Sequence, residues 1–383
     1  MDYLLTEEQE ELRKIARRIA LEKVKPVREK YDREGTFPWD MVKVFADAGF
    51  FELWIPEEYG GAGAGVMELC LVTEELSRIC GGIALAVAAT ALGSFPIIIS
   101  GNDEQKKKYL PEIASGKMLA GFGLTEPLAG SDAGSIRTTA RKEGDYYILN
   151  GQKCFITNGG EAKIYTVIAS TDPSKGTRGA SAFIVEEGFE GFSYGKREDK
   201  MGIRASSTSD LIFEDCKVPA ENLLEKEGLG FKVAMKTLDK SRPGVAAQAL
   251  GIAQGALDLA LEYTAQREQF GQSINSFQGV QWMLADMASQ IEASRALVYS
   301  AARMIDAGKS NVARGSAICK LVASDVAMRV TTDAVQLFGG YGYMRDYPIE
   351  KFMRDAKITQ IYEGTNQIQR VVISKSLIRE AAS

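Results

Sequence analysis

A segment near the C-terminus carries a glutamate whose neighbours suit it to proton transfer. Glu363 lies between Tyr362 and Gly364, and only uncharged residues follow it until Arg370. A carboxylate among apolar groups has its pKa raised, because burial penalises the charged form, and such a group can act as a general base. A solvated glutamate at the start of a helix, with Thr365 nearby, explains the same residues. The local pattern therefore leaves both interpretations open.

The composition narrows the chemistry to a few side-chain types. The chain of 383 residues contains no histidine, which excludes a Ser-His-Asp or Cys-His nucleophile and a His-ligated zinc site. Proton transfer must then use a carboxylate, lysine, tyrosine, cysteine or a cofactor. The formal charge of −5 provides no basic surface for nucleic acid. We expect neither a metal site nor a nucleic-acid partner.

Three further segments combine glycine, hydroxyl and aromatic residues. The run Phe122–Asp132 can bring backbone N–H groups close to a pyrophosphate, and a plain interdomain turn explains it equally well. Phe155 and Thr157 alternate at the end of a strand, so one face could offer a ring and a hydroxyl to a planar cofactor, although core packing is the commoner reason. Gln336–Gly342 places three glycines at a helix end, where a C-cap explains only one of them comfortably.

The elements that position these segments follow the order helices, strands, helices. Residues 1–120 show helical periodicity that begins with a capping box at Thr6. Residues 231–383 carry a long apolar stripe through Val280, Met287 and Ile291, which is typical of a helix bundle. Between them, residues 121–230 alternate strand-like runs with turn residues. The expected fold class is α+β and multidomain, with an N-terminal all-α domain, a middle β domain and a C-terminal helical bundle.

Several elements are predicted individually. Helices are expected around 66–80 and 83–99. The pair Asn150-Gly151 separates two apolar runs and predicts the turn of a β-hairpin. Further strands are expected at Ile164–Ala169, Ser181–Val185 and Asp210–Phe213.

The sequence also bears on where the protein works. The longest uncharged stretch, Ile83–Ser100, contains Gly93 and Pro96, so it suits a buried helix better than a membrane span. The five cysteines form no CxxC pair and have an odd count, which is typical of reduced thiols. The acidic first helix does not resemble a signal segment. We expect a cytoplasmic protein that does not bind a membrane.

Taken together, these segments resemble the acyl-CoA dehydrogenase family over essentially the whole chain. Gly123–Ser135 resembles the first family signature, and Gln336–Asp355 resembles the second. Ile361–Arg370 is similar to the catalytic segment of short- and medium-chain members. The resemblance implies the acyl-CoA dehydrogenase fold with a C-terminal four-helix bundle, FAD as cofactor, an acyl-CoA substrate and a homotetramer. It also implies that electrons pass to an electron-transferring flavoprotein.

The resemblance assigns roles to individual residues. Glu363 would remove the alpha proton of the thioester while the beta hydrogen leaves as hydride to flavin N5, which yields a 2-enoyl-CoA. The N–H of Glu363 and a ribityl hydroxyl would bind the thioester oxygen. The implied cofactor contacts are Phe122, Leu124, Thr125, Gly130, Ser131, Phe155, Thr157, Arg267, Phe270, Gln336, Gly339, Gly340, Thr365 and Gln367. Arg267 and Phe270 would serve the cofactor of a neighbouring subunit. The implied substrate contacts are Ser131, Asp239, Arg242, Ala88, Thr90, Tyr362 and Gly364.

Two alternatives share this fold. An acyl-CoA oxidase would pass its electrons to oxygen, although such enzymes are usually much longer. A non-enzymatic flavin-binding relative would need a basic face, which the acidic composition does not favour. Within the family, isovaleryl-type enzymes place the base at the position of Ser241, and residues 81–99 lack the arginine expected for a dicarboxylate substrate. The acyl group stays open between short, medium, branched and alicyclic.

Overall fold

Helices form the first part of the chain in the computed structural model, which describes residues 3–382. The capping box predicted at Thr6 is present, because the Thr6 hydroxyl accepts a hydrogen bond from the Gln9 N–H and the Gln9 side chain accepts one from the Thr6 N–H. The helices and helical turns of this part are α1 (Glu7–Ile19), η1 (Ala20–Val24), α2 (Arg28–Glu34), α3 (Trp39–Asp47), η2 (Glu57–Tyr59), α4 (Val66–Ser100) and α5 (Asp103–Ala114).

The two helices predicted around 66–80 and 83–99 form one element, α4. It spans 35 residues and bends at Cys80, whose φ of −157° and ψ of 105° are not helical. By length and composition, α4 and α6 (Gly230–Gln266) are apolar enough to cross a membrane, but 78% of the most apolar window of each is buried inside the protein. Such burial is what the core helix of a globular domain shows, and the buried helix predicted at Ile83–Ser100 is confirmed.

The middle of the chain forms an eight-stranded sheet in the order β6-β7-β3-β2-β4-β5-β8, with β1 beside β4. Strands predicted at Ile164–Ala169, Ser181–Val185 and Asp210–Phe213 are present within β4, β5 and β7. The bounds are β1 (Ala120–Gly123), β2 (Thr139–Glu143), β3 (Tyr146–Thr157), β4 (Ile164–Ser170), η3 (Pro173–Gly179), β5 (Ala180–Glu186), β6 (Phe192–Arg197), β7 (Thr208–Pro219), η4 (Ala220–Asn222) and β8 (Leu223–Leu224).

The hairpin predicted at Asn150-Gly151 is wrong. β3 continues through both residues, and the hairpin lies earlier, where Glu143 of β2 faces Tyr146 of β3. The register of β3 against β7 shifts between Leu149 and Gly151 instead, as at a β-bulge. The Asn150 side chain donates a hydrogen bond to Asp215 Oδ1 and accepts one from Asp215 N, both at 2.9 Å. Because β3 has a partner strand on each side, the pair is held in the sheet and cannot turn.

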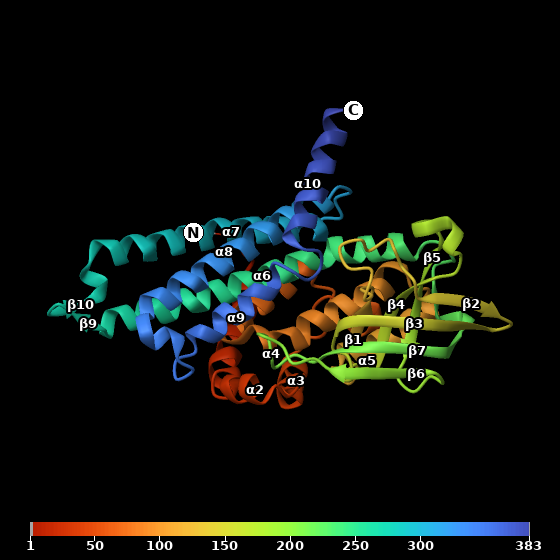
Figure 1. The fold of residues 1–383 in the computed structure, drawn as a ribbon, viewed down its shortest axis with the longest axis horizontal. Coiled ribbons are helices and arrows are strands. Elements are labelled where there is room, and N and C mark those ends of the chain that lie inside the picture. The colour runs from red at the N-terminus through yellow and green to blue at the C-terminus, as the bar shows by residue number, and fades with distance from the viewer. Residues whose placement is uncertain (1–2, 383) are drawn as a thin grey trace.

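The last part of the chain returns to helices. The predicted apolar stripe lies on α7 and faces the protein core, where Met287, Ile291 and Val298 are buried. α6, α7 and α8 run alongside one another, and the sheet lies at the end of the molecule opposite the β9–β10 hairpin (Figure 1). The bounds are α7 (Gln278–Asp306), α8 (Ala313–Phe338), α9 (Ile349–Thr359), α10 (Asn366–Ala381), β9 (Glu268–Gln269), β10 (Gln272–Ser273), η5 (Ile274–Ser276) and η6 (Gly339–Tyr343).

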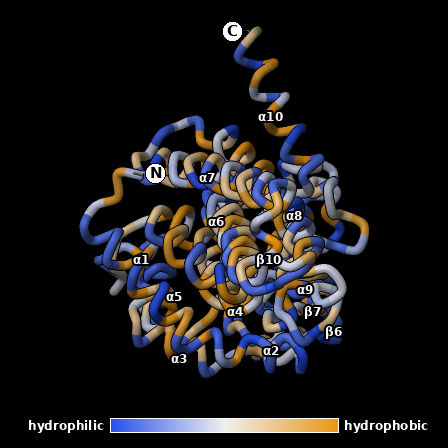
Figure 2. Tube along the Cα trace, turned by 90° about the vertical axis from the view of Figure 1, so that its left-hand side faces the viewer, coloured by the Kyte–Doolittle hydropathy of each residue, from blue (hydrophilic) through white to orange (hydrophobic). Residues whose placement is uncertain are grey.

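One hydrophobic core connects the helices with the sheet. Apolar segments lie toward the inside of the Cα trace, and α10 extends away from the body (Figure 2). All five cysteines are free and buried, as expected for reduced thiols. Burial raises the pKa of the Cys216 and Cys319 thiols to about 12.

Candidate active site

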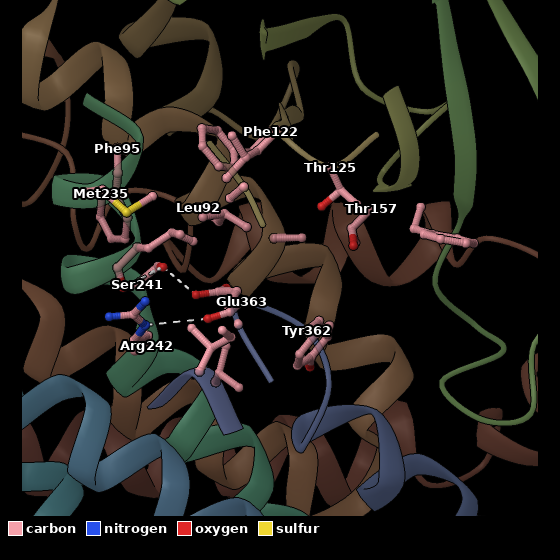
Figure 3. A pocket seen from close by; sticks show the side chains of 18 of the residues that line it. Leu92, Phe95, Phe122, Thr125, Thr157, Met235, Ser241, Arg242, Tyr362 and Glu363 are labelled. Atoms are coloured by element: carbon pink, nitrogen blue, oxygen red, sulfur yellow. Dashed lines mark hydrogen bonds between the residues drawn. The ribbon is translucent and has the colours of Figure 1, made fainter. Parts of the chain in front are cut away.

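The helices, the sheet and the bundle meet around a central cavity of about 470 Å³. Its walls come from α4, the loop after β1, the end of β3, α6 and the loop between α9 and α10 (Figure 3). A second cavity of about 650 Å³ continues from the first and reaches Thr365. The residues that line both cavities are Thr125, Gly130, Ser131, Phe155, Thr157, Tyr362, Glu363 and Gly364.

Glu363 lies in the loop between α9 and α10 and faces α6. Its φ of 52° is left-handed, and Gly364 follows with a φ of 91°. The Ser241 hydroxyl donates a hydrogen bond to Glu363 Oε2 at 2.5 Å (Figure 3). A non-glycine residue with positive φ is unfavourable and persists where the surrounding structure holds it. The loop therefore presents one carboxylate to the cavity in a constrained conformation.

The electrostatic surroundings of Glu363 suit a general base. Burial raises the pKa of the Glu363 carboxyl, while the Ser241 hydrogen bond and the positive charges of Arg242 and Lys320 lower it. Burial has the larger effect, so the net pKa lies above the ordinary value for glutamate. A base with a raised pKa binds a proton more strongly and is still ionised once the pH exceeds that pKa.

We expect activity to depend on pH through this carboxyl. Because the carboxylate form accepts the proton, kcat/KM should fall as the pH drops through the raised pKa of Glu363. Ser241→Ala removes a hydrogen bond that favours the charged form, so the acidic limb should move to higher pH. The pH profile of kcat/KM measures the shift, with Ser289→Ala on the exposed face of α7 as control. A limb that stays in place or moves to lower pH would contradict the contact.

A buried ion pair lies behind the wall formed by the loop after β1 and by β3. Lys153 Nζ lies 2.6 Å from Glu126 Oε1 and donates to Leu124 O at 3.1 Å. Glu126 also accepts the N–H groups of Arg137 and Thr138 at 2.7 and 3.0 Å. Both charged side chains are buried, and burial lowers the pKa of Lys153 to about 8. The pair ties the segment that carries Leu124 and Thr125 to β3.

The sequence-based interpretation missed this pair. The available signal was a lysine directly before the apolar run Cys154–Ile156. A charged residue in a buried strand requires a partner, but the partner lies in a different segment of the chain and cannot be read from local spacing.

Eleven of the fourteen predicted cofactor residues fall into two separate groups, and the other three lie outside both. Phe122, Leu124, Thr125, Gly130, Ser131, Phe155 and Thr157 line the central cavity, and Thr365 lines its extension. Arg267, Gly339 and Gly340 instead line a groove with Tyr341, near the β9–β10 hairpin. The Arg267 guanidinium lies 5.6 Å from the centre of the Tyr341 ring. Phe270 is 94% exposed, and Gln336 and Gln367 are exposed on helix surfaces.

The central group fits a flat cofactor with hydrogen-bonding edges. Phe155 is 66% exposed although it lies between the buried residues Cys154 and Ile156 of β3, and its φ is 59°. Within residues 3–382, no protein group binds the hydroxyl of Thr125 or Thr157, and both side chains lie at the cavity (Figure 3). A Cβ added at Gly130 would meet nothing within 4 Å. An unpacked ring, two free hydroxyls and open space are features that an isoalloxazine system can use.

The predicted substrate residues are only partly brought together. Ala88, Ser131, Arg242, Tyr362 and Gly364 line the central cavity. Thr90 does not: it is buried, its hydroxyl donates to Ala86 O at 2.8 Å, and it accepts a hydrogen bond from Asn158 at 3.3 Å. Asp239 does not line the cavity either, and accepts a hydrogen bond from Arg242 Nη1 at 2.8 Å.

Comparison with known proteins agrees with this architecture. Three family models match in sequence: the acyl-CoA dehydrogenase N-terminal domain over residues 6–117, the middle domain over 121–216 and the C-terminal domain over 228–378. These matches define the class, a three-part oxidoreductase with the acyl-CoA dehydrogenase fold, and they confirm the predicted fold class.

The individual relatives are similar over nearly their whole length. The chain is 51% identical to the acyl-CoA dehydrogenase, short-chain specific, of Clostridium acetobutylicum, over 99% of this chain and 100% of the other. The solved butyryl-CoA dehydrogenase of Megasphaera elsdenii is 50% identical, with a TM-score of 0.96 over 99% of this chain and all of the other. A chain solved in work on the electron transferring flavoprotein of Acidaminococcus fermentans is 54% identical, with a TM-score of 0.97 over 99% and 100%. The protein belongs to the acyl-CoA dehydrogenase family.

Proposed function

We propose that this protein is an FAD-dependent acyl-CoA dehydrogenase for short acyl chains, with Glu363 as the base that removes the alpha proton. The observation that carries this proposal is the Glu363 carboxylate, which has a raised pKa and lies at the central cavity beside a cluster of residues that fits a flavin. Its relatives include enzymes named for short-chain and butyryl-CoA dehydrogenation.

The residues of the chain would act in three ways. Glu363 would accept the alpha proton, and its own backbone N–H, which binds no other group within residues 3–382, is free to bind the thioester oxygen. Arg242 and Gln369 hold the carbonyl of Glu363 at 3.5 and 3.2 Å, which keeps the base in place. Thr125, Phe155 and Thr157 would hold the flavin, and FAD when bound supplies the acceptor for the beta hydride.

The wall of the cavity supports a short acyl group. The Tyr362 hydroxyl donates a hydrogen bond to Gln248 Oε1, and Gln248 Nε2 donates to Gly81 O at 2.9 Å. Both side chains line the cavity, together with Leu85 and Leu92. A longer acyl chain would have to displace this hydrogen-bonded pair, and leaving buried polar groups unpaired is unfavourable.

A panel of acyl-CoA thioesters tests the function. Under anaerobic conditions, butyryl-CoA should bleach the flavin faster than octanoyl-CoA or palmitoyl-CoA, because the longer chains do not fit beside Tyr362 and Gln248. Stopped-flow absorbance measures the rates. Protein that remains colourless with added FAD, or that no acyl-CoA bleaches, would contradict the proposal.

The electron acceptor is proposed to be an electron-transferring flavoprotein. The similarity to a chain solved in work on such a flavoprotein supports this partner. Exposing the bleached protein to air separates the alternatives, because rapid reoxidation by oxygen would favour an acyl-CoA oxidase. A cytoplasmic location stays a prediction.

We further propose a homotetramer in which one subunit completes the cofactor site of another. The two groups of predicted cofactor residues support this arrangement, since Arg267 and Gly339 line a groove remote from Thr125 and Phe155. Within residues 3–382, Arg267 lines neither the central cavity nor its extension, so it cannot contact a cofactor bound there in its own subunit.

Arg267→Ala is therefore expected to weaken FAD retention without loss of folding. Removing a guanidinium that contacts a bound cofactor costs about 1–3 kcal/mol when the contact is charge-assisted. The ratio of flavin to protein absorbance after gel filtration measures retention. Arg141→Ala, at a side chain 70% exposed on β2, is the control. Flavin content equal to that of the control would contradict the contact between subunits.

A further inference from the structure

Lys320 on α8 is a buried amine close to the proposed base. Its Nζ donates hydrogen bonds to Gly364 O at 2.9 Å and to Asn366 Oδ1 at 3.0 Å. The side chain is fully buried, and burial lowers its pKa to about 8. Lys320 on α8 thus contacts Gly364, the residue that follows Glu363 in the loop between α9 and α10.

The loop that carries Glu363 needs support because two consecutive residues have left-handed backbone angles. Side chains from three helices hold its carbonyl groups. Arg242 on α6 and Gln369 on α10 donate to Glu363 O, while Lys320 on α8 and Gln369 donate to Gly364 O, the latter at 2.8 Å. These contacts fix the peptide units on the C-terminal side of the base.

The charge of Lys320 has no paired carboxylate. Within residues 3–382 no Asp or Glu oxygen lies within salt-bridge distance of Lys320, and Asp325 pairs with Arg370 instead. A buried, unpaired ammonium is costly. The carboxylate whose charge favours the ammonium form most is Glu363, whereas Arg242 disfavours it.

We propose that Lys320 is a positioning residue that holds the Glu363 loop in its left-handed conformation and, through its positive charge, stabilises the carboxylate form of the base. This inference rests on the proposed function of Glu363. The charged and titratable groups that face Glu363 are Arg242 on α6, Lys320 on α8 and Tyr362 in the same loop, and Asp325 on α8 faces Lys320. A neutral hydrogen-bond donor at position 320 would provide the first effect and not the second.

Two substitutions separate these effects. Lys320→Met removes both the donor and the charge, whereas Lys320→Gln keeps a donor and removes only the charge. Ser324→Ala is the matched control, because Ser324 binds Asn366 at 3.1 Å but does not contact Glu363 or Gly364. The measurement is the rate of anaerobic flavin bleaching by saturating butyryl-CoA as a function of pH, on holoenzyme with known flavin content.

We expect Lys320→Met to slow bleaching at least about tenfold at every pH, because small displacements of a catalytic group are costly in rate. Its acidic limb should also move to higher pH, since the carboxylate loses a stabilising charge. Lys320→Gln should recover most of the rate at high pH and keep the shifted limb. Ser324→Ala should bleach at a rate within about twofold of the wild type, and its acidic limb should stay in place.

The inference is overturned if both Lys320 variants retain full flavin and show the rate and the pH limb of the control. It is also overturned if the rate falls while the limb stays in place, because Lys320 would then support the loop without acting on the base. If Lys320→Met does not fold, the inference is tested by Lys320→Gln alone: an acidic limb that stays at the pH of the control overturns it. Wild-type protein that butyryl-CoA does not bleach, or Glu363→Gln protein that it bleaches normally, would refute the proposed function itself.

Discussion

Glu363→Gln is expected to slow flavin bleaching by butyryl-CoA about 10²–10⁴-fold, the range that a positioned general base contributes. Glutamine has nearly the same shape and retains the backbone N–H, so substrate and cofactor should still bind. Its amide cannot accept the alpha proton. Stopped-flow absorbance gives the rate, and the visible spectrum gives the flavin content.

The side chains that contact Glu363 cannot replace it as a base. Ser241 and Arg242 form hydrogen bonds with Glu363 at the cavity, and neither an alcohol nor a guanidinium is a base at neutral pH. Glu58→Gln, at an exposed glutamate of η2, controls for the loss of a charge. Near-normal bleaching by Glu363→Gln would refute Glu363 as the base.

The largest expected effect on stability comes from Lys153. Lys153→Met leaves the Glu126 carboxylate buried without its cation, and removing one partner of a buried pair costs about 3–5 kcal/mol. Urea denaturation at a fixed excess of FAD measures the change, because cofactor binding itself adds to stability. The loop after β1 should loosen as well, since Lys153 also binds Leu124 O.

Two further variants show whether burial causes this cost. Lys163→Met breaks the pair between Lys163, directly before β4, and Glu187, directly after β5. Their side chains are 53% and 38% exposed, and the loss should cost no more than about 1 kcal/mol. Glu126→Gln combined with Lys153→Met should recover part of the loss, because no unpaired charge remains. A loss from Lys153→Met as small as that from Lys163→Met would contradict the interpretation.

Local patterns were sufficient where a segment's neighbours along the chain decide its structure. The Thr6 capping box and the stripe through Met287 and Ile291 both depend on residues a few positions apart, and both are present. The Asn150-Gly151 turn failed because β7 and β2 hold β3 from either side. Pairing between distant strands overrode a strong local preference.

The same distinction applies to the site. Leu85, Ala88, Ala89 and Leu92 recur at helical spacing and share the face of α4 that lines the cavity, whereas Thr90 lies off that face and binds Asn158. Helical spacing therefore separates Ala88 from Thr90 once the direction of the cavity is known. Lys153 and Lys320 could not be predicted, because their partners Glu126 and Gly364 are brought near only by the fold.

The burial of every cysteine has a practical consequence. Cys154, Cys216 and Cys319 have their pKa raised to between about 11 and 12 by burial, so these three side chains form almost no thiolate, the reactive form. Alkylating reagents and peroxide should therefore react with these side chains only when the surrounding structure opens. The rate at which a thiol reagent labels these cysteines can therefore report local unfolding of the sheet and the bundle, without any engineered cysteine.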